Sequence, residues 1–168
     1  MDRVAAKILN ELLGVEKELP APAPKAQPRN AADHWTRPIL LERAAYLGKL
    51  ARYGEGSASE TIKEHPQYSA MLSVRSRSGE AEVHENFAHL YFVLDGSATL
   101  VSGGTLVGST QNGPGEIRGG VRCELRAGDV AHVPAGQPHQ FLVGGEKAVT
   151  CLVIKVQETP SQAGAATH

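Results

Sequence analysis

The sequence predicts an all-β protein: an antiparallel β-barrel or jelly roll preceded by an N-terminal helical extension. Short runs that alternate apolar and polar residues fill residues 58–157, and Gly, Pro, Asp and Asn separate them. Fourteen of the 18 glycines lie at or beyond Gly79, as expected for a region rich in turns. The 168 residues suit a single domain. Alternation with frequent turns is typical of antiparallel sheets that close into a barrel or sandwich.

Residues 1–29 are predicted to form a helical arm and a proline-rich linker. Val4, Ile8, Leu12 and Val15 follow helical spacing, and four prolines occupy residues 20–28. Such proline-rich chain is extended and semi-rigid. An isolated helix of this length is marginal in water, so we expect its apolar stripe to pack on a second subunit and build a homodimer. A floppy tail, or an arm folded back on its own barrel, is the alternative.

The remaining divisions follow from changes in pattern. Residues 30–57 are predicted to be a helical lead-in, with a helix over 38–53 that starts near Pro38. Residues 58–157 then form the barrel, and residues 158–168 a flexible tail. The long glycine-rich segment 102–120 is expected to be a functional or mobile loop.

Composition excludes several functions. Seventeen basic and 18 acidic residues give a net charge of -1, and aromatic residues make up 5%. Neither value favours nucleic-acid binding. No run of about 18 apolar residues exists, so no membrane span is expected. The first 20 residues lack the unbroken apolar run of a signal peptide, which predicts a cytoplasmic protein. A secreted or periplasmic protein whose leader has been removed is the alternative.

The two cysteines, Cys123 and Cys151, are too few for a disulfide scaffold and lack the spacing of a zinc finger. We expect two small buried apolar side chains. One structural disulfide remains as the alternative.

Histidines and one glutamate supply the candidate chemistry. Glu82 and His84 are two residues apart, so both point to one face of a strand. His89 follows after a short loop, and His139 follows a proline–glycine turn at the start of a further strand. If these strands are neighbours, three imidazoles and a carboxylate meet, a set that suits one divalent transition metal: Fe, Mn, Ni, Zn or Cu. His132 is expected to face outward or to lie at the rim.

The segment from Gly79 to Val143 resembles the two sequence motifs of the cupin superfamily. The second motif is glycine, five residues, Pro-x-Gly, two residues and histidine. Gly128, Pro134, Gly136 and His139 match every one of these positions. The family ends this motif with asparagine four residues after the histidine, where this chain has Val143.

The first motif matches in spacing but exchanges residue types. The usual pattern is His-x-His, three or four residues, glutamate, six residues and glycine. Here Glu82 takes the first histidine position and His89 takes the glutamate position, while His84 and Gly96 match. An alternative alignment starts the motif at His84 and makes Asn86 the second ligand. It leaves only two residues before His89, so the first alignment is preferred.

The resemblance implies a cupin fold and a metal held by Glu82, His84, His89 and His139. It leaves two functions open. One is a metal-dependent enzyme, such as a dioxygenase, isomerase, lyase or decarboxylase, that acts on a small molecule inside the barrel. The other is a non-catalytic module that binds or senses a small ligand. The fold does not decide between them, because one fold hosts many functions.

Overall fold

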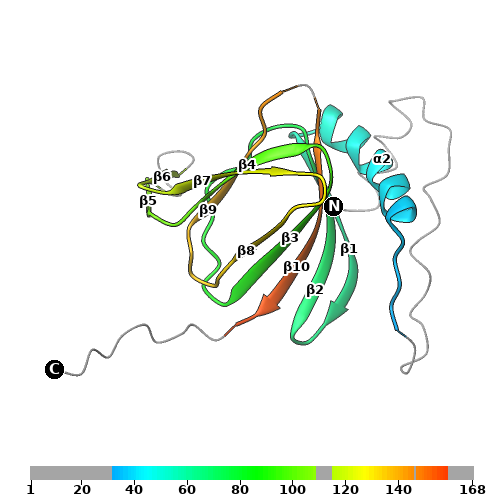
Figure 1. The fold of residues 1–168 in the computed structure, drawn as a ribbon, viewed down its shortest axis with the longest axis horizontal. Coiled ribbons are helices and arrows are strands. Elements are labelled where there is room, and N and C mark those ends of the chain that lie inside the picture. The colour runs from blue at the N-terminus through cyan, green and yellow to red at the C-terminus, as the bar shows by residue number, and fades with distance from the viewer. Residues whose placement is uncertain (1–31, 109–114, 146, 159–168) are drawn as a thin grey trace. The chain divides into compact units, whose positions relative to one another are not determined.

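The computed structural model of the chain describes residues 32–108, 115–145 and 147–158. The predicted arm, residues 1–29, and all of the predicted tail after Glu158 lie outside these residues. The described elements are one helix and ten strands (Figure 1): α2 (Arg37–Tyr53), β1 (Ser57–His65), β2 (Tyr68–Arg75), β3 (Phe87–Asp95), β4 (Ser97–Ser102), β5 (Thr105–Val107), β6 (Glu116–Arg118), β7 (Val121–Arg126), β8 (Val130–Val133), β9 (His139–Leu142) and β10 (Val149–Gln157).

All strand pairs between these elements are antiparallel, which confirms the predicted fold class. A five-stranded sheet has the order β1-β2-β10-β3-β8, and a three-stranded sheet has the order β7-β4-β9 (Figure 1). Because β10 lies between β2 and β3, the last strand of the sequence is central to the larger sheet. The larger sheet therefore brings together residues that are far apart in the sequence.

Helix α2 covers part of the outer face of the larger sheet. Leu40, Ala44, Leu47 and Ala51 are buried at helical spacing and form one side of the helix. They pack in one apolar cluster with side chains of β1 and β2: Ala58, Leu72 and Val74. The helix spans nearly the predicted 38–53. Pro38 stands in its first turn, where the missing N–H has no partner to lose.

A second apolar cluster fills the space between the two sheets. Its members come from both sheets, and the buried ones are Tyr91, Val93, Ala98, Leu100, Leu125, Val133, Phe141, Val149, Cys151 and Val153. The connection from β3 to β4 turns at Gly96, which has a φ of +76°. A Cβ there would lie 2.3 Å from the carbonyl oxygen of Ala148, so this turn requires glycine.

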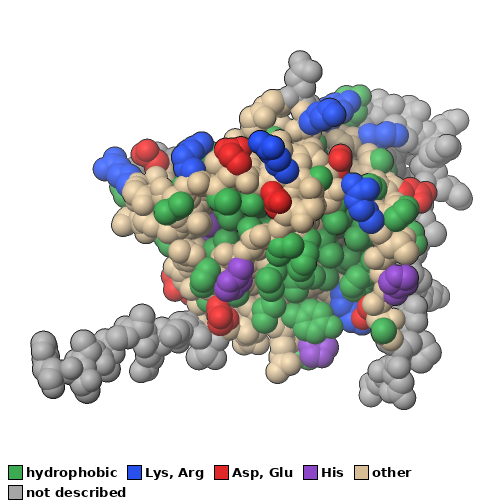
Figure 2. Space-filling view, viewed as in Figure 1, with side chains coloured by type: hydrophobic (Ala, Val, Ile, Leu, Met, Phe, Trp, Pro, Cys, Tyr) green, Lys and Arg blue, Asp and Glu red, His purple; other side chains and the backbone are tan. Residues whose placement is uncertain are grey.

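Apolar side chains also gather on a part of the outer sheet face that α2 does not cover. Figure 2 shows this patch in green below the helix. Val130 of β8 is 56% exposed and pairs with Phe92 of β3, which in turn pairs with Leu152 of β10. This face therefore presents apolar surface beyond the helix.

Two segments differ in detail from the sequence-based expectation. The run Gly79–Glu85 alternates as a strand does, but it forms only one isolated bridge, between Glu82 and His139. The glycine-rich segment 102–120 contains the short hairpin β5–β6, whose connecting residues 109–114 are not described. Among the described residues, no helix has the length and apolar character needed to cross a membrane.

Candidate metal centre

Three histidine side chains meet at one end of the space between the sheets. His89 comes from β3, His139 from the start of β9 and His84 from the segment before β3. One ring nitrogen of each lies within 4.8 Å of the other two. His89 and His139 are buried, with 2% and 4% of their surface exposed, and His84 is partly exposed. The structure thus brings together all three histidines that the sequence predicted.

Backbone pairing explains how the two sequence motifs meet. Glu82 and His139 exchange two backbone hydrogen bonds of 2.9 Å across their isolated bridge. The backbone N–H of Gly136 donates to the carbonyl oxygen of His84 at 2.9 Å. Gly136 has a φ of +74°, a conformation that glycine adopts without strain, so this turn can approach the first motif. The proline–glycine turn therefore aims His139 at His84.

Hydrogen bonds to the other ring nitrogens orient two of the imidazoles. Nδ1 of His139 lies 3.0 Å from the carbonyl oxygen of Gln137. A carbonyl only accepts, so Nδ1 carries the proton and Nε2 keeps its lone pair. Nδ1 of His89 lies 2.9 Å from the hydroxyl of Tyr91. Such contacts set the tautomer and ring orientation of metal-binding histidines.

The Nε2 atoms of His89 and His139 are buried and have no hydrogen-bond partner among the described residues. A buried polar atom without a partner is costly, and native structures usually satisfy it. A metal ion would satisfy both atoms at once, since neutral imidazole nitrogen is a common ligand of transition metals. The residues present therefore fit a bound metal.

The electrostatics of the cluster also favour neutral imidazoles. Burial lowers the pKa of His89 to about 3, and the nearby His84, His139 and Lys155 add to this decrease. Burial likewise lowers the pKa of His139, against the opposing effects of the Gln137 carbonyl and Glu82. Imidazoles that stay unprotonated at neutral pH are ready to bind a cation.

Glu82, the predicted carboxylate ligand, lies beside the cluster. Its Oε2 is 2.9 Å from Nε2 of His84, and its Oε1 is 3.9 Å from Nη2 of Arg75. The side chain is 43% exposed. The expectation that Glu82 and His84 share one face is met, although the segment is not a regular strand.

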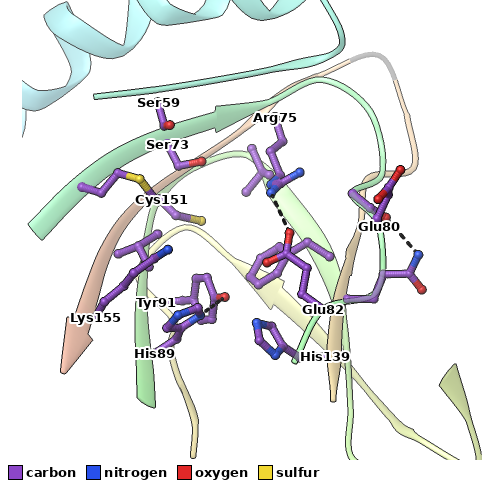
Figure 3. A pocket seen from close by; sticks show the side chains of 16 residues that line it. Ser59, Ser73, Arg75, Glu80, Glu82, His89, Tyr91, His139, Cys151 and Lys155 are labelled. Atoms are coloured by element: carbon purple, nitrogen blue, oxygen red, sulfur yellow. Dashed lines mark hydrogen bonds and ion pairs between the residues drawn. The ribbon is translucent and has the colours of Figure 1, made fainter. Parts of the chain in front are cut away.

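A cavity of about 240 Å³ lies next to the cluster, against the inner face of the five-stranded sheet (Figure 3). Met71, Val149 and Val153 give it an apolar wall, and Ser59 and Ser73 add hydroxyl groups. Its charged and histidine lining residues are Arg75, Glu80, Glu82, His89, His139 and Lys155. The site can therefore bring a small molecule close to the histidines.

Sequence reasoning missed three residues of this site: Arg75, Tyr91 and Lys155. Tyr91 stands two residues after His89 in β3, so strand alternation alone could have placed it on the same face. No local sequence pattern marks Arg75 or Lys155 as a residue of the site. They join the site because β2 and β10 lie beside β3 in the sheet.

Other candidate residues lie away from the cluster. His132 is exposed on β8, which confirms the outward position expected for it. Asn86, the alternative ligand, is exposed in a turn. Both cysteines are free, so they form no disulfide. Cys151 is buried in the cavity wall, where burial raises the pKa of its thiol to about 12, but Cys123 is exposed, contrary to expectation.

Comparison with known proteins identifies the same architecture. The Cupin domain model, Cupin_2, matches residues 69–155. Protein TT1209 of Thermus thermophilus is 22% identical, with a TM-score of 0.50 over 67% of this chain and 94% of its own. A cupin superfamily protein of Desulfitobacterium hafniense is 19% identical, with a TM-score of 0.44 over 61% of this chain and 78% of its own. No curated protein matches the chain.

Two antiparallel sheets around a cavity and a cluster of three histidines, two of them buried, define a small β-barrel protein whose histidines are compatible with a metal ion. The family match covers more than half of the chain, and the chain belongs to the cupin domain family. The predicted membership of the cupin superfamily is thereby confirmed.

Proposed function

We propose that this cupin holds one divalent transition metal, Fe, Mn, Ni, Zn or Cu, on His84, His89, His139 and Glu82. The observation that carries the proposal is the pair of buried Nε2 atoms on His89 and His139, which have no hydrogen-bond partner in the part of the chain that the structure describes. They lie in a group whose ligand atoms are all within 4.8 Å of one another. Ligands about 2.1 Å from a metal are at most about 4.2 Å apart, so small side-chain movements suffice.

Glu82 is proposed as the fourth ligand. Two neighbouring ligands at about 2.1 Å from a metal, at right angles, lie about 3 Å apart. The 2.9 Å between Oε2 of Glu82 and Nε2 of His84 is close to that value. The same contact also serves as a hydrogen bond, which would instead leave Glu82 as the residue that orients His84.

We propose further that the protein is a metal-dependent enzyme that acts on a small molecule in the cavity, in the manner of a dioxygenase, isomerase, lyase or decarboxylase. A bound divalent metal acts as a Lewis acid toward a coordinated oxygen. The chain itself supplies the apolar wall of Met71, Val149 and Val153, which suits the carbon atoms of a small molecule. Tyr91 holds the ring of His89.

A non-catalytic module that binds a small ligand is the second candidate. The cavity favours it, because about 240 Å³ of partly apolar space next to polar groups suits ligand binding without a reaction. Turnover of a bound small molecule distinguishes the two functions. A protein that binds metal and ligand but converts no ligand is the binding module.

The metal content of the purified full chain tests the site. We expect about one equivalent of a transition metal per chain by elemental analysis, and near-complete loss in His139→Ala because the variant lacks one buried ligand. His132→Gln is the matched control, since His132 is exposed and outside the cluster. Equal metal content in the wild type and His139→Ala would contradict the proposal.

A further inference from the structure

Lys155 is a cation in the cavity wall that forms no ion pair with a counter-charge among residues 32–108, 115–145 and 147–158. It lies on β10 opposite His89 of β3, and its side chain is half-buried. Figure 3 shows Lys155 beside His89 and Tyr91, in the wall of the cavity. Among the described residues, its ammonium group makes no hydrogen bond or ion pair.

The other cation of the cavity is balanced. Arg75 faces Glu82, with 3.9 Å between Nη2 and Oε1, and Glu80 lines the same part of the wall. In Figure 3 these three residues lie together, apart from Lys155. A positive charge in the wall of a partly enclosed cavity attracts an anion to that cavity. Lys155 is therefore the cation of the cavity that is available to bind an anion.

Lys155 lies next to the histidine cluster in the fold. It pairs with His89 across β10 and β3 and lines the same cavity as His89 and His139. A divalent metal on these neutral imidazoles would add further positive charge to the same end of the cavity. Metal and lysine would then both favour a negatively charged ligand between them.

We propose that the natural small molecule of this cavity is a carboxylate whose charge is met by Lys155 next to the histidine cluster. The inference rests on the proposed function, since it names the substrate class of that same site. Ser59 and Ser73, paired across β1 and β2, offer hydroxyl groups to the rest of the ligand. The apolar wall of Met71 and Val153 suits its carbon skeleton.

Binding of one carbon skeleton in three charge states tests this inference. The probes are malonate, its monoamide and its diamide, titrated by calorimetry into the Co²⁺-loaded full chain. We expect affinity to fall as charge is removed, and to weaken as salt is added. In Lys155→Met, malonate binding is expected to weaken about tenfold to a hundredfold through loss of a charge-assisted hydrogen bond.

The choice of methionine, a metal measurement and a control variant keep the result interpretable. Methionine keeps an unbranched side chain in the wall, and cobalt content is measured for each variant. Lys49→Met is the matched control, because Lys49 is exposed on α2. This substitution removes the same charge as Lys155→Met does, but away from the cavity. The control is expected to bind malonate as the wild type does.

Each outcome separates this inference from the metal proposal. If cobalt binds but Lys155→Met binds malonate as tightly as Lys49→Met does, the carboxylate site is overturned and the metal site stands. If no cobalt binds while malonate binds with the expected dependence on Lys155, the metal proposal fails and the anion site is supported. Absence of both cobalt and malonate binding overturns both.

Discussion

The two faces of the five-stranded sheet carry different kinds of residues on the same strands. In β2, Leu72 and Val74 point outward and pack in the cluster under α2, whereas Ser73 and Arg75 point inward and line the cavity. Strand β10 repeats this division, with Leu152 packed on the helix side and Lys155 in the cavity. Alternation in each strand keeps the two sets apart.

The residues under α2 mainly stabilise the fold, whereas the residues that line the cavity include the groups that can do chemistry. The outer face under the helix buries apolar side chains, the main favourable contribution to folding. The inner face buries imidazoles whose pKa is lowered, and two of their ring nitrogens have no hydrogen-bond partner within the described residues. Such groups cost stability unless a ligand satisfies them. The inner face also carries the apolar cluster between the sheets, but next to it lie the costly imidazoles, so variants under the helix and at the histidines should have different effects.

The largest effect on folding is expected on the outer face. Leu72 is fully buried, with 0% of its surface exposed, so Leu72→Ala should lower the free energy of unfolding by about 2–5 kcal/mol. Urea unfolding measures this change. Metal bound per folded chain should stay unchanged. Val121→Ala, at a 71% exposed strand position, is the control and should change stability little. Loss of metal in folded Leu72→Ala would contradict the separation of the two faces.

Tyr91→Phe on the inner face is expected to lower metal affinity and to change the stability of the fold little. This variant removes the hydroxyl 2.9 Å from Nδ1 of His89 but keeps the aromatic ring. Loss of a group that orients a ligand should weaken metal affinity about 10- to 100-fold. Competition with a chelator measures the affinity. Tyr53→Phe, at a 61% exposed position on α2, is the matched control and should keep wild-type affinity. Equal affinities in both variants would remove Tyr91 from the site.

Low pH should decrease the free energy of unfolding of the metal-free protein, because His89 on the inner face is held neutral. The pKa of His89 is about 3 when folded and near 6.5 when unfolded, so the unfolded chain binds more protons between these values. The contribution of neutral His89 is thus complete above pH 6.5. Below it, the free energy of unfolding should fall by about 1.4 kcal/mol per pH unit.

His89→Leu should have a shallower dependence on pH over the same range, because leucine cannot take up a proton. Urea unfolding between about pH 7 and pH 4.5, with a chelator present, measures the slopes. His132→Gln removes an exposed histidine and should keep the wild-type slope. Parallel slopes for His89→Leu and the wild type would show that His89 is not held neutral by the fold.

Deletion of residues 1–29 is expected to have the smallest effect on the stability and the metal content of the two sheet faces. The amphipathic pattern of this arm predicts a role in dimerisation. Light scattering should show a dimer for the full chain and a monomer for the truncated chain, while metal content stays the same. An unchanged mass and melting temperature after truncation would exclude the arm from the dimer interface.

Local pattern was sufficient for much of the fold. The alternating runs predicted the antiparallel sheets, and helical spacing around Pro38 predicted α2. The Gly128–His139 motif predicted the turn that aims His139. Pattern failed at Gly79–Glu85, where the chain alternates like a strand but forms only one bridge. Alternation describes which residues share a face, but it does not show whether a neighbouring strand is available for pairing.

By itself, the sequence determined the family, the sheet class and the three histidines that meet, because these depend on periodicity and on short motifs. Tertiary structure alone decided which other residues face those histidines. Lys155 is 66 residues from His89 in the numbering, yet the two are direct partners across β10 and β3. The physical reason is strand register, since a shift by one residue would turn Lys155 to the opposite face and remove the cavity's unpaired charge.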